Sequence, residues 1–426
     1  MSDYFDRVER QLIRSVEAGV PRSRRPAIRF EQLAYVAALL VVVAVVAVFV
    51  GLRGQRQTGS PSTSRGTALV FSALPAGPGA RLVPALDRSV VILRKRFDSI
   101  LPGAGIRRVG DEIVVTDRHR RDLAKILALS APGQLSFYDW EADALVPTGA
   151  HAGATVASRL EARDPAALLT SQGDATLPTG SPGAGSLGLY QAVELGHRQA
   201  VAPGIANESH AFYLFGAPGS SACEVAARAR GAGPRPGGGH CLLAGPDNSV
   251  ANLRVDLGAA FGGQVTLAQG RLITLRGTVV LQAVDPNPGT PVPVYSPRAQ
   301  FYVLRGVRAL GPGALTRARA STDSTGSPDV EFDFTSAGGR AFTSVTDRIA
   351  KRGFRVSSAG ETLDQHFAIV LDGELLSVPS IAYNIYPDGV SEAHGADIAA
   401  AFTRVSAREL ATLLRFGPLP VRLVLR

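Results

Sequence analysis

The sequence has few of the residues that usually mark a catalytic or metal centre. Its 426 residues include two cysteines, and its seven histidines are dispersed, at His119, His151, His197, His210, His240, His366 and His394. Neither H-E-x-x-H nor G-x-S-x-G occurs. No segment supplies a nucleophile, a base and an oxyanion site together. We therefore predict that the chain is not an enzyme and holds no cofactor or metal ion.

Lysine and aromatic residues are also scarce. There are three lysines and 6% aromatic residues, so the net charge of +9 comes almost entirely from arginine. The arginines are scattered and do not interleave with aromatic residues, which disfavours a nucleic-acid surface. The densest group precedes an apolar stretch and is typical of a membrane topology signal; it consists of Arg22, Arg24, Arg25 and Arg29.

Charge and proline are absent from residues 33–52. Twenty apolar residues at about 1.5 Å each in a helix span about 30 Å, the thickness of a bilayer's hydrocarbon core. A cleaved signal peptide is the alternative, but the leading segment is long and Arg53 and Arg56 follow directly, which favours an uncleaved anchor. We predict a single-pass protein of the cell membrane, with residues 1–32 cytoplasmic and the bulk of the chain extracytoplasmic.

Cys223 and Cys241 both follow the predicted membrane helix and are 18 residues apart. In an oxidising compartment such a pair favours a disulfide, which typically adds about 3 kcal/mol of stability. Two free buried thiols are the alternative. His240 adjoins Cys241, but the spacing of these three residues is not that of a zinc site.

The remaining chain divides by composition. Residues 53–66 read as a flexible linker, and residues 67–146 follow the order β-α-β-β-α-β, with QLSFYDW as the last strand. This order favours a ferredoxin-like module, two helices on an antiparallel sheet. Residues 147–296 form a variable middle region rich in glycine and proline, with a helix near 187–196 and strands at FYLF, RLITLR and TVVLQAV. The predicted fold class is α+β.

Glycines 183, 185 and 188 match the pattern G-x-G-x-x-G in the middle region. A dinucleotide-binding fingerprint has to follow directly on a strand, whereas here the pattern follows a loop rich in proline, glycine, serine and threonine. We interpret it as a flexible turn.

Residues 297–426 are regular again. FAIVLDGELLSVPSI predicts a tight hairpin with Asp372-Gly373 at its turn, because glycine accepts positive φ. Ser406 and Glu409 have the spacing of a capping box that opens a helix, which Gly417 ends.

This hairpin and the following FTRVSARELATLLRFGPLPV resemble the extracytoplasmic domain of the SecD and SecDF protein-export membrane proteins. The residues that match the family pattern are Asp372, Gly373, Ser377, Pro379, Ile381, Gly395, Phe402, Thr403, Leu410, Ala411, Leu414, Gly417, Leu419, Pro420 and Val421. A longer insertion follows Gly395, which departs from the pattern. The chain ends at LPVRLVLR, where the family continues into further transmembrane helices.

The resemblance implies a membrane-anchored accessory of Sec-dependent protein export, seated in the lipid bilayer. Its expected ligand is an unfolded secretory polypeptide, and its expected partners are the Sec translocon or a SecF-like membrane protein. The family's proton-driven motor uses ionisable residues of the later helices, so we expect this chain to act without a motor of its own. The alternative is an envelope binding or structural protein that keeps the fold without the export role.

Overall fold

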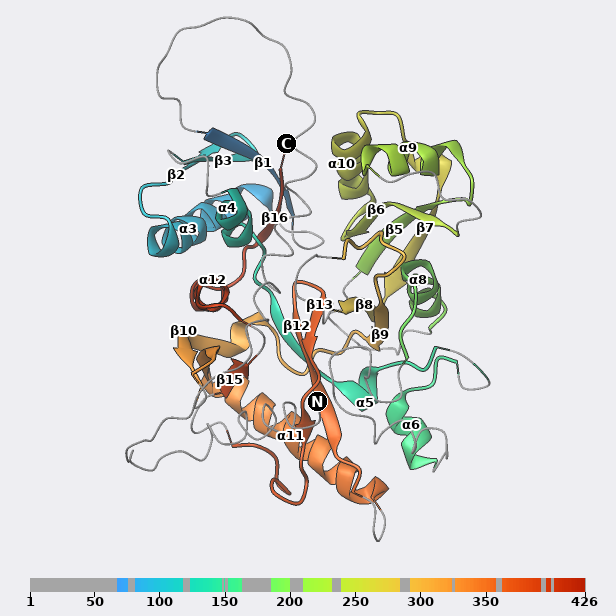
Figure 1. Cartoon of the computed structure of the whole chain (residues 1–426), viewed down its shortest axis with the longest axis vertical. Coiled ribbons are helices and arrows are strands. Elements are labelled where there is room, and N and C mark those ends of the chain that lie inside the picture. The colour runs from blue at the N-terminus through green and yellow to red at the C-terminus, as the bar shows by residue number, and fades with distance from the viewer. Residues whose placement is uncertain are drawn as a thin grey trace, which may run out of the picture.

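The computed structural model describes residues 67–425 except 76–80, 118–122, 148, 150–151, 163–184, 200–209, 232–238, 284–291, 324–325, 358–361, 392–395 and 400–401. The predicted cytoplasmic tail, the membrane helix at 33–52 and the linker at 53–66 thus lie outside the described residues. Among those described, no helix combines the length and apolar character that a membrane crossing requires. The fold mixes helices with several separate sheets, which agrees with the α+β prediction (Figure 1).

The N-terminal lobe is a four-stranded antiparallel sheet with two helices against it. The strand order is β16-β1-β3-β2, so the fourth strand comes from the far end of the chain. The lobe consists of β1 (Thr67–Pro75), α3 (Leu82–Ile100), β2 (Gly105–Val109), β3 (Glu112–Asp117), α4 (Leu123–Leu129) and β16 (Val421–Leu425). Its apolar core contains Leu86, Val90, Leu93 and Phe97, which recur at helical spacing on the buried face of α3.

The prediction that QLSFYDW forms the fourth strand of this lobe is wrong. QLSFYDW contains β4 (Leu135–Asp139), which pairs antiparallel with β12 in another sheet. Every residue of β4 is buried, as expected for a strand covered on both faces, and this suits it to the large central sheet. The open place beside β1 is taken by β16 instead, with Phe71 opposite Leu425 and Pro75 opposite Val421.

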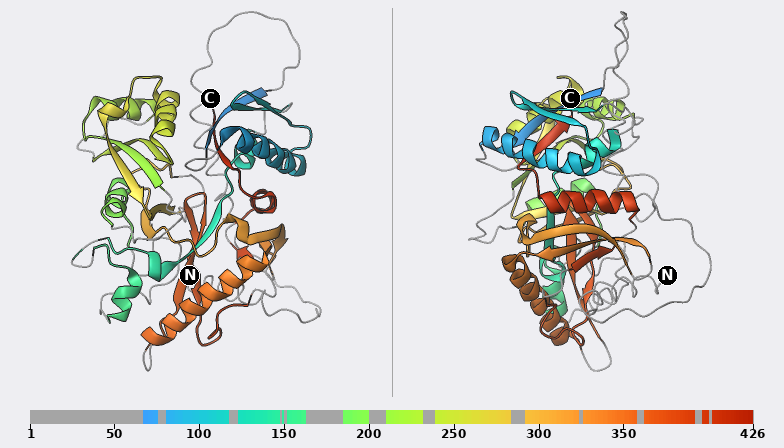
Figure 2. Two further views of the ribbon diagram at one scale, coloured as in Figure 1. Left: turned by 180° about the vertical axis from the view of Figure 1, so that it is seen from behind. Right: turned by 90° about the vertical axis from the view of Figure 1, so that its left-hand side faces the viewer.

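The central body holds two sheets. The larger has the order β14-β12-β13-β8-β9, with β4 beside β12, and the smaller has the order β10-β11-β15. The strands are β8 (Thr278–Ala283), β9 (Phe301–Arg305), β10 (Leu315–Thr322), β11 (Pro328–Phe334), β12 (Gln365–Leu371), β13 (Glu374–Ser377), β14 (Ser380–Ile381) and β15 (Ala396–Ala399). The helices are α5 (Trp140–Asp143), α6 (Val156–Glu161), α11 (Ser336–Val356) and α12 (Arg404–Phe416). Figure 2 shows α12 between the N-terminal lobe and the smaller sheet.

The middle lobe is a three-stranded antiparallel sheet of order β6-β5-β7 with its own core. Its elements are α8 (Leu189–His197), β5 (His210–Gly216), α9 (Ser221–Ala229), β6 (Cys241–Asp247), α10 (Val250–Phe261) and β7 (Gly270–Arg276). The predicted helix near 187–196 is α8, whose N-cap is Gly188; Gly183 of the glycine pattern lies outside the described residues. The middle and N-terminal lobes stand side by side at one end of the central body (Figures 1 and 2).

Candidate functional site

The hairpin of β12 and β13 lies at the centre of the molecule. Both residues of its turn have positive φ, 52° at Asp372 and 88° at Gly373, which confirms the predicted two-residue turn. β12 is buried throughout and has β13 and β14 as neighbours as well as β4. The turn therefore projects from a fully buried strand of the central body.

The Asp372 carboxylate ties this turn to the chain that enters β4. It accepts backbone N–H groups of Gly133 at 3.0 Å and Gln134 at 2.8 Å, and the Asp372 N–H donates to the Gln134 carbonyl at 3.1 Å. Burial raises the pKa of Asp372, while the two N–H donors and Arg96 oppose that rise. The carbonyl of Gly373 accepts the Gln282 N–H at 3.1 Å, so the turn is also fixed to β8.

Two segments of the chain connect the N-terminal lobe to the central body. They are residues 130–134 and 416–420, and we call them the neck. Arg96 of α3 is fully buried and donates hydrogen bonds to four neck or helix-end carbonyls. The acceptors are Leu129 at 2.9 Å, Ala131 at 2.6 Å, Pro132 at 3.1 Å and Gly417 at 2.7 Å. Burial lowers the pKa of Arg96 to about 10, so the guanidinium remains charged at neutral pH.

Close packing at the neck depends on a glycine. Gly133 has φ +74°, and a Cβ there would lie 2.8 Å from Nη2 of Arg96. The Leu419 N–H also donates to the Pro132 carbonyl at 2.9 Å, so the two segments of the neck are hydrogen-bonded to each other directly. Arg96, Asp372 and Gly417 thus form one connected site, although they lie far apart in the sequence.

A second buried polar cluster links α11 to β4, α5 and β12. Arg352 donates from Nη1 to Asp139 Oδ2 at 3.0 Å and from Nε to Gln365 Oε1 at 3.1 Å. Glu141 accepts the His366 backbone N–H at 2.8 Å, and its other oxygen lies 2.6 Å from His366 Nδ1. All these side chains are less than a tenth exposed, so the cluster stabilises the fold and offers no open surface to a substrate.

The charges of this cluster set the protonation of its carboxyl groups. Burial raises the pKa of Glu141, but the charges and hydrogen bonds of His366 and Arg352 outweigh it, and the net pKa is lowered. Asp143 lacks such strong support, so burial and the charge of Asp139 raise its pKa well above the usual range. The cluster therefore places a carboxyl group with a lowered pKa beside one with a raised pKa.

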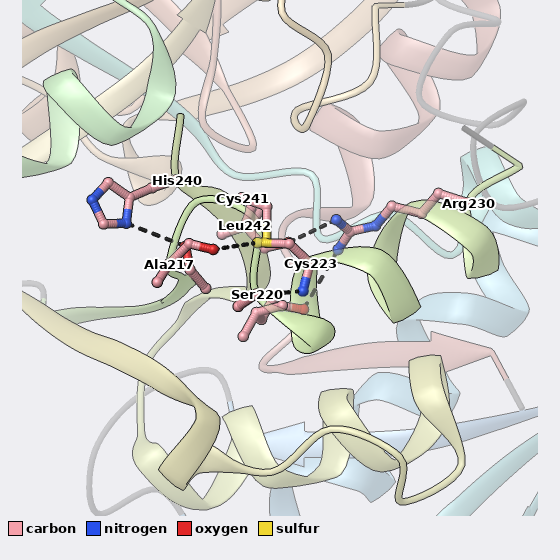
Figure 3. The surroundings of a disulfide bond; sticks show 9 residues. Ala217, Ser220, Cys223, Arg230, His240, Cys241 and Leu242 are labelled. Atoms are coloured by element: carbon pink, nitrogen blue, oxygen red, sulfur yellow. Dashed lines mark hydrogen bonds between the residues drawn. A yellow bond between two sulfur atoms is a disulfide. The ribbon is translucent and has the colours of Figure 1, made fainter. Parts of the chain in front are cut away.

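A disulfide joins Cys223 on α9 to Cys241 on β6, with Cα atoms 5.8 Å apart (Figure 3). Arg230 at the end of α9 donates to the Leu242 carbonyl at 2.6 Å, which fixes the same helix to the same strand. Because both sulfur atoms are bonded to each other, neither thiolate is available to a metal beside His240. Within the described part of the chain, no group of three or more His, Cys, Asp or Glu residues could hold a metal ion.

Comparison with known proteins connects this geometry to a family. Residues 292–421 match the family model for the P1 head subdomain of SecDF. The chain is 36% identical over 131 residues to the protein translocase subunit SecD of Rickettsia bellii, and 34% identical over 142 residues to that of Rhodobacter capsulatus. These residues are similar to the extracytoplasmic portion of the SecD/SecDF family. The family relatives are bacterial protein translocase subunits.

The two matches cover 30% and 32% of this chain, and each spans 22% of the relative. A solved structure of SecDF, described as a membrane component that enhances protein export, aligns with 84% of this chain and 97% of its own, at 18% identity and a TM-score of 0.37.

The SecD-like head, residues 292–421, brings most of the predicted motif residues to two places. Asp372 and Gly373 form the hairpin turn, and Ser377 and Pro379 follow it, with the Pro379 carbonyl accepting the Phe367 N–H at 3.0 Å. Phe402 packs in the core of the head, whereas Leu419 and Val421 pack in the core of the N-terminal lobe. Gly417 and Pro420 lie in the neck. Gly395 lies outside the described residues.

The start of α12, the helix that follows the hairpin in the family pattern, differs from the prediction. The capping box was expected at Ser406 and Glu409, but α12 begins at Arg404 with Thr403 as its N-cap. Thr403 Oγ1 accepts the Ser406 N–H at 3.0 Å, and Ser406 Oγ accepts the Thr403 N–H at 2.9 Å. A serine at the third helical position can return the bond of the cap as glutamate would, which the S/T-x-x-E pattern does not detect.

Sequence reasoning missed Arg96 as a site residue. The available signal was its position on α3, three residues after Leu93 and within the buried face of the helix. An arginine on an otherwise inward-facing stripe has to find acceptors, because an unpaired buried charge is strongly destabilising. Its acceptors could not be identified from the sequence, since Gly417 is 321 residues away.

The SecD-like head also carries exposed apolar side chains. Phe354 near the end of α11 is 70% exposed and Ile385 is 56% exposed. The Phe354 ring contacts Tyr383 with centroids 6.0 Å apart, and Ile385 follows in the same turn. We call Phe354, Tyr383 and Ile385 the apolar patch of the head.

Proposed function

We propose that this chain is a SecD-like accessory of Sec-dependent protein export that binds translocating polypeptide on the extracytoplasmic side of the membrane. The match of residues 292–421 to the SecDF P1 head subdomain carries the proposal. The predicted helix at 33–52 would anchor the chain in a single pass, with the N-terminus in the cytoplasm. The Sec translocon or a SecF-like membrane protein is the partner we expect. That the chain acts without a proton-driven motor of its own stays a prediction.

The apolar patch is the contact we propose for the polypeptide. An unfolded chain exposes apolar side chains that a folded protein buries, and exposed aromatic and aliphatic side chains can bind them. Phe354 and Ile385 are large, exposed and close to Tyr383 on one side of the head. Contact there requires no opening of the buried core.

The neck would keep the head in a fixed position relative to the membrane-proximal part of the chain. We take the N-terminal lobe to be a ferredoxin-like module that β16 completes. Because both segments of the neck connect the central body to that lobe, a force on bound polypeptide would be transmitted through two covalent connections. The hydrogen bonds of Arg96 and Asp372 stiffen both of them.

Site-specific crosslinking tests the proposal. A photoreactive residue at position 354 or 385 of the full-length protein should form adducts with a secretory precursor that is stalled during export. The same residue at Arg317, whose side chain is 79% exposed on the same head but outside the patch, is the matched control and should give background only.

Two results would count against the proposal. Background signal at positions 354, 385 and 317 alike would remove the export role and favour the alternative, an envelope binding or structural protein. Equal adduct formation at all three positions would leave an export role but reject the apolar patch as the contact. Recovery of translocon subunits with the solubilised protein would test the partner separately.

A further inference from the structure

Polar side chains connect the middle lobe to the N-terminal lobe. Arg422 on β16 places Nη2 2.9 Å from Asp247 Oδ2 and 2.8 Å from Asp256 Oδ2. Asp247 ends β6, and Asp256 lies on α10. Asn248 donates to the carbonyl of Pro75, the last residue of β1, and is itself held by Asn252 at 2.6 Å. The contact thus joins the end of β1 and the start of β16 to one corner of the middle lobe.

The contact is ionic and not a shared apolar core. The core of the N-terminal lobe and that of the middle lobe have no described residue in common. Arg422 is paired with Leu74 in the β1–β16 ladder, so its backbone is fixed while its side chain extends to the neighbouring lobe. The attachment of the two lobes here therefore depends on the charge of three side chains, together with the hydrogen bond from Asn248.

The charges at this contact do not balance. Two carboxyl groups face one guanidinium, and the Asp247 side chain is 1% exposed while that of Asp256 is 20% exposed. Two neighbouring carboxylates with little access to water repel each other, and one shared proton removes the excess charge. Arg422 meets both groups through Nη2, and its buried Nε has no hydrogen-bond partner in this arrangement.

We propose that Arg422, Asp247 and Asp256 form a latch that holds the middle lobe against the N-terminal lobe while the two carboxyl groups share a proton, and that loosens when the proton is lost. The latch does not depend on the proposed export role. It would give the middle region, which the family match does not include, a conformational function of its own.

The titration of Asp247 supports the direction of this effect. Burial and the hydrogen bond with Asp256 raise its pKa to about 7, against the opposing charge of Arg422. Asp256 and Arg422 are the charged groups that face it, from α10 and β16. Because the closed state binds the proton more tightly than an open, solvated Asp247 would, closure is favoured below this pKa and weakens as the pH rises through it.

The size of the effect follows from the same pKa. If Asp247 titrates near 7 when closed and at its ordinary value when open, the ratio of closed to open molecules falls as much as about 30-fold between about pH 5.5 and about pH 8.5. Partial exposure of Arg422 and Asp256 makes this an upper value.

Distance measurement between spin labels in the full-length protein tests the latch. Cysteines introduced at Leu272 of the middle lobe and Val91 of the N-terminal lobe are exposed by 43% and 49%, and the native cysteines are already bonded to each other. The distance distribution should be narrow at about pH 5.5 and broaden at about pH 8.5. If the distance distribution of the labelled protein does not change between these two pH values, the proposal is overturned, and no substitution in the latch is needed to show it.

Three variants in the labelled protein assign the effect to the latch. Asp247→Asn imitates the protonated carboxyl group and should keep the distribution narrow at both pH values. Arg422→Gln should broaden it at both. Arg319→Gln removes an exposed ion pair with Glu331 in the head and should behave as the unmodified protein. Retention of the full pH response in Asp247→Asn would reject this assignment, provided circular dichroism shows that the variant is folded.

Discussion

Replacement of Arg96 by methionine is the sharpest test of the neck. Methionine fills much of the same space but donates no hydrogen bond, so one buried and three partly buried carbonyls lose their guanidinium donor. The Pro132 carbonyl keeps the Leu419 N–H, which leaves those of Leu129, Ala131 and Gly417. Each unsatisfied buried acceptor costs about 1–3 kcal/mol.

The loss is partly offset, because burying the guanidinium in the native protein also costs free energy. We therefore expect Arg96→Met to lower the free energy of unfolding by about 3–5 kcal/mol, near the lower end of the summed loss of three acceptors. Arg96→Lys keeps the charge but presents a compact ammonium group in place of the planar guanidinium. Its free energy of unfolding should lie between those of the unmodified protein and Arg96→Met.

The assay is urea unfolding of the full-length protein in detergent, followed by the fluorescence of its single tryptophan. Trp140 is fully buried in the core of the central body, at the end of β4 away from the neck, so its emission reports on the unfolding of that body. Arg94→Met is the matched control on the same helix, because Arg94 is exposed and donates to a single carbonyl, that of Ile106 on β2. It should change the free energy by less than about 1 kcal/mol.

Equal small effects of Arg96→Met and Arg94→Met would refute the reasoning. That result would mean that water or relaxed backbone satisfies the three carbonyls once the guanidinium is gone. Hydrogen exchange at the Gly133 and Gln134 amides would then remain slow in the variant, since Asp372 would still bind them. Faster exchange at these amides together with a large loss of stability would support the connected site.

Three further predictions concern the buried charges and the disulfide. Asp143→Asn should leave stability unchanged below the ordinary aspartate pKa and raise it increasingly as the pH climbs from there through the raised pKa of folded Asp143, because ionisation of Asp143 favours the unfolded chain; urea midpoints at a pH below and a pH above this range measure this. Asp139→Asn should instead lower stability by about 3–5 kcal/mol in the same assay, since it leaves Arg352 without its nearest carboxylate. Replacing both Cys223 and Cys241 by serine should destabilise the middle lobe by about 3 kcal/mol, seen as faster limited proteolysis between α9 and β6 while the neck stays protected.

Local patterns in the sequence predicted the local structure well. The apolar face of α3 and the Asp372-Gly373 turn both follow from the spacing and φ preference of a few neighbouring residues. The predicted strands FYLF and RLITLR lie within β5 and β7, and the first six residues of TVVLQAV form β8. In each case the information is contained within about ten residues, which is the range over which periodicity and turn chemistry operate.

Pairing between distant segments could not be predicted in the same way. QLSFYDW and VRLVL both read as short apolar strands, and either could complete the sheet beside β1 on local grounds. The choice is made by the surroundings, because β4 is buried on both faces beside β12 whereas β16 retains partly exposed residues at the edge of its sheet. Arg96 and the Arg422 contact were missed for the same reason, since their partners lie 33 to 321 and 166 to 175 residues away.

The motif residues at the end of the head acquire a physical role from this topology. Gly417 supplies a carbonyl to Arg96, Leu419 bonds Pro132 and enters the core of the N-terminal lobe, and Val421 begins the strand that completes the sheet. None of these contacts involves the exposed surface of the head. The pattern G-x-L-P-V therefore reads as the attachment of the head to the lobe that precedes it, and the binding surface has to be sought among residues outside this pattern, such as Phe354 and Ile385.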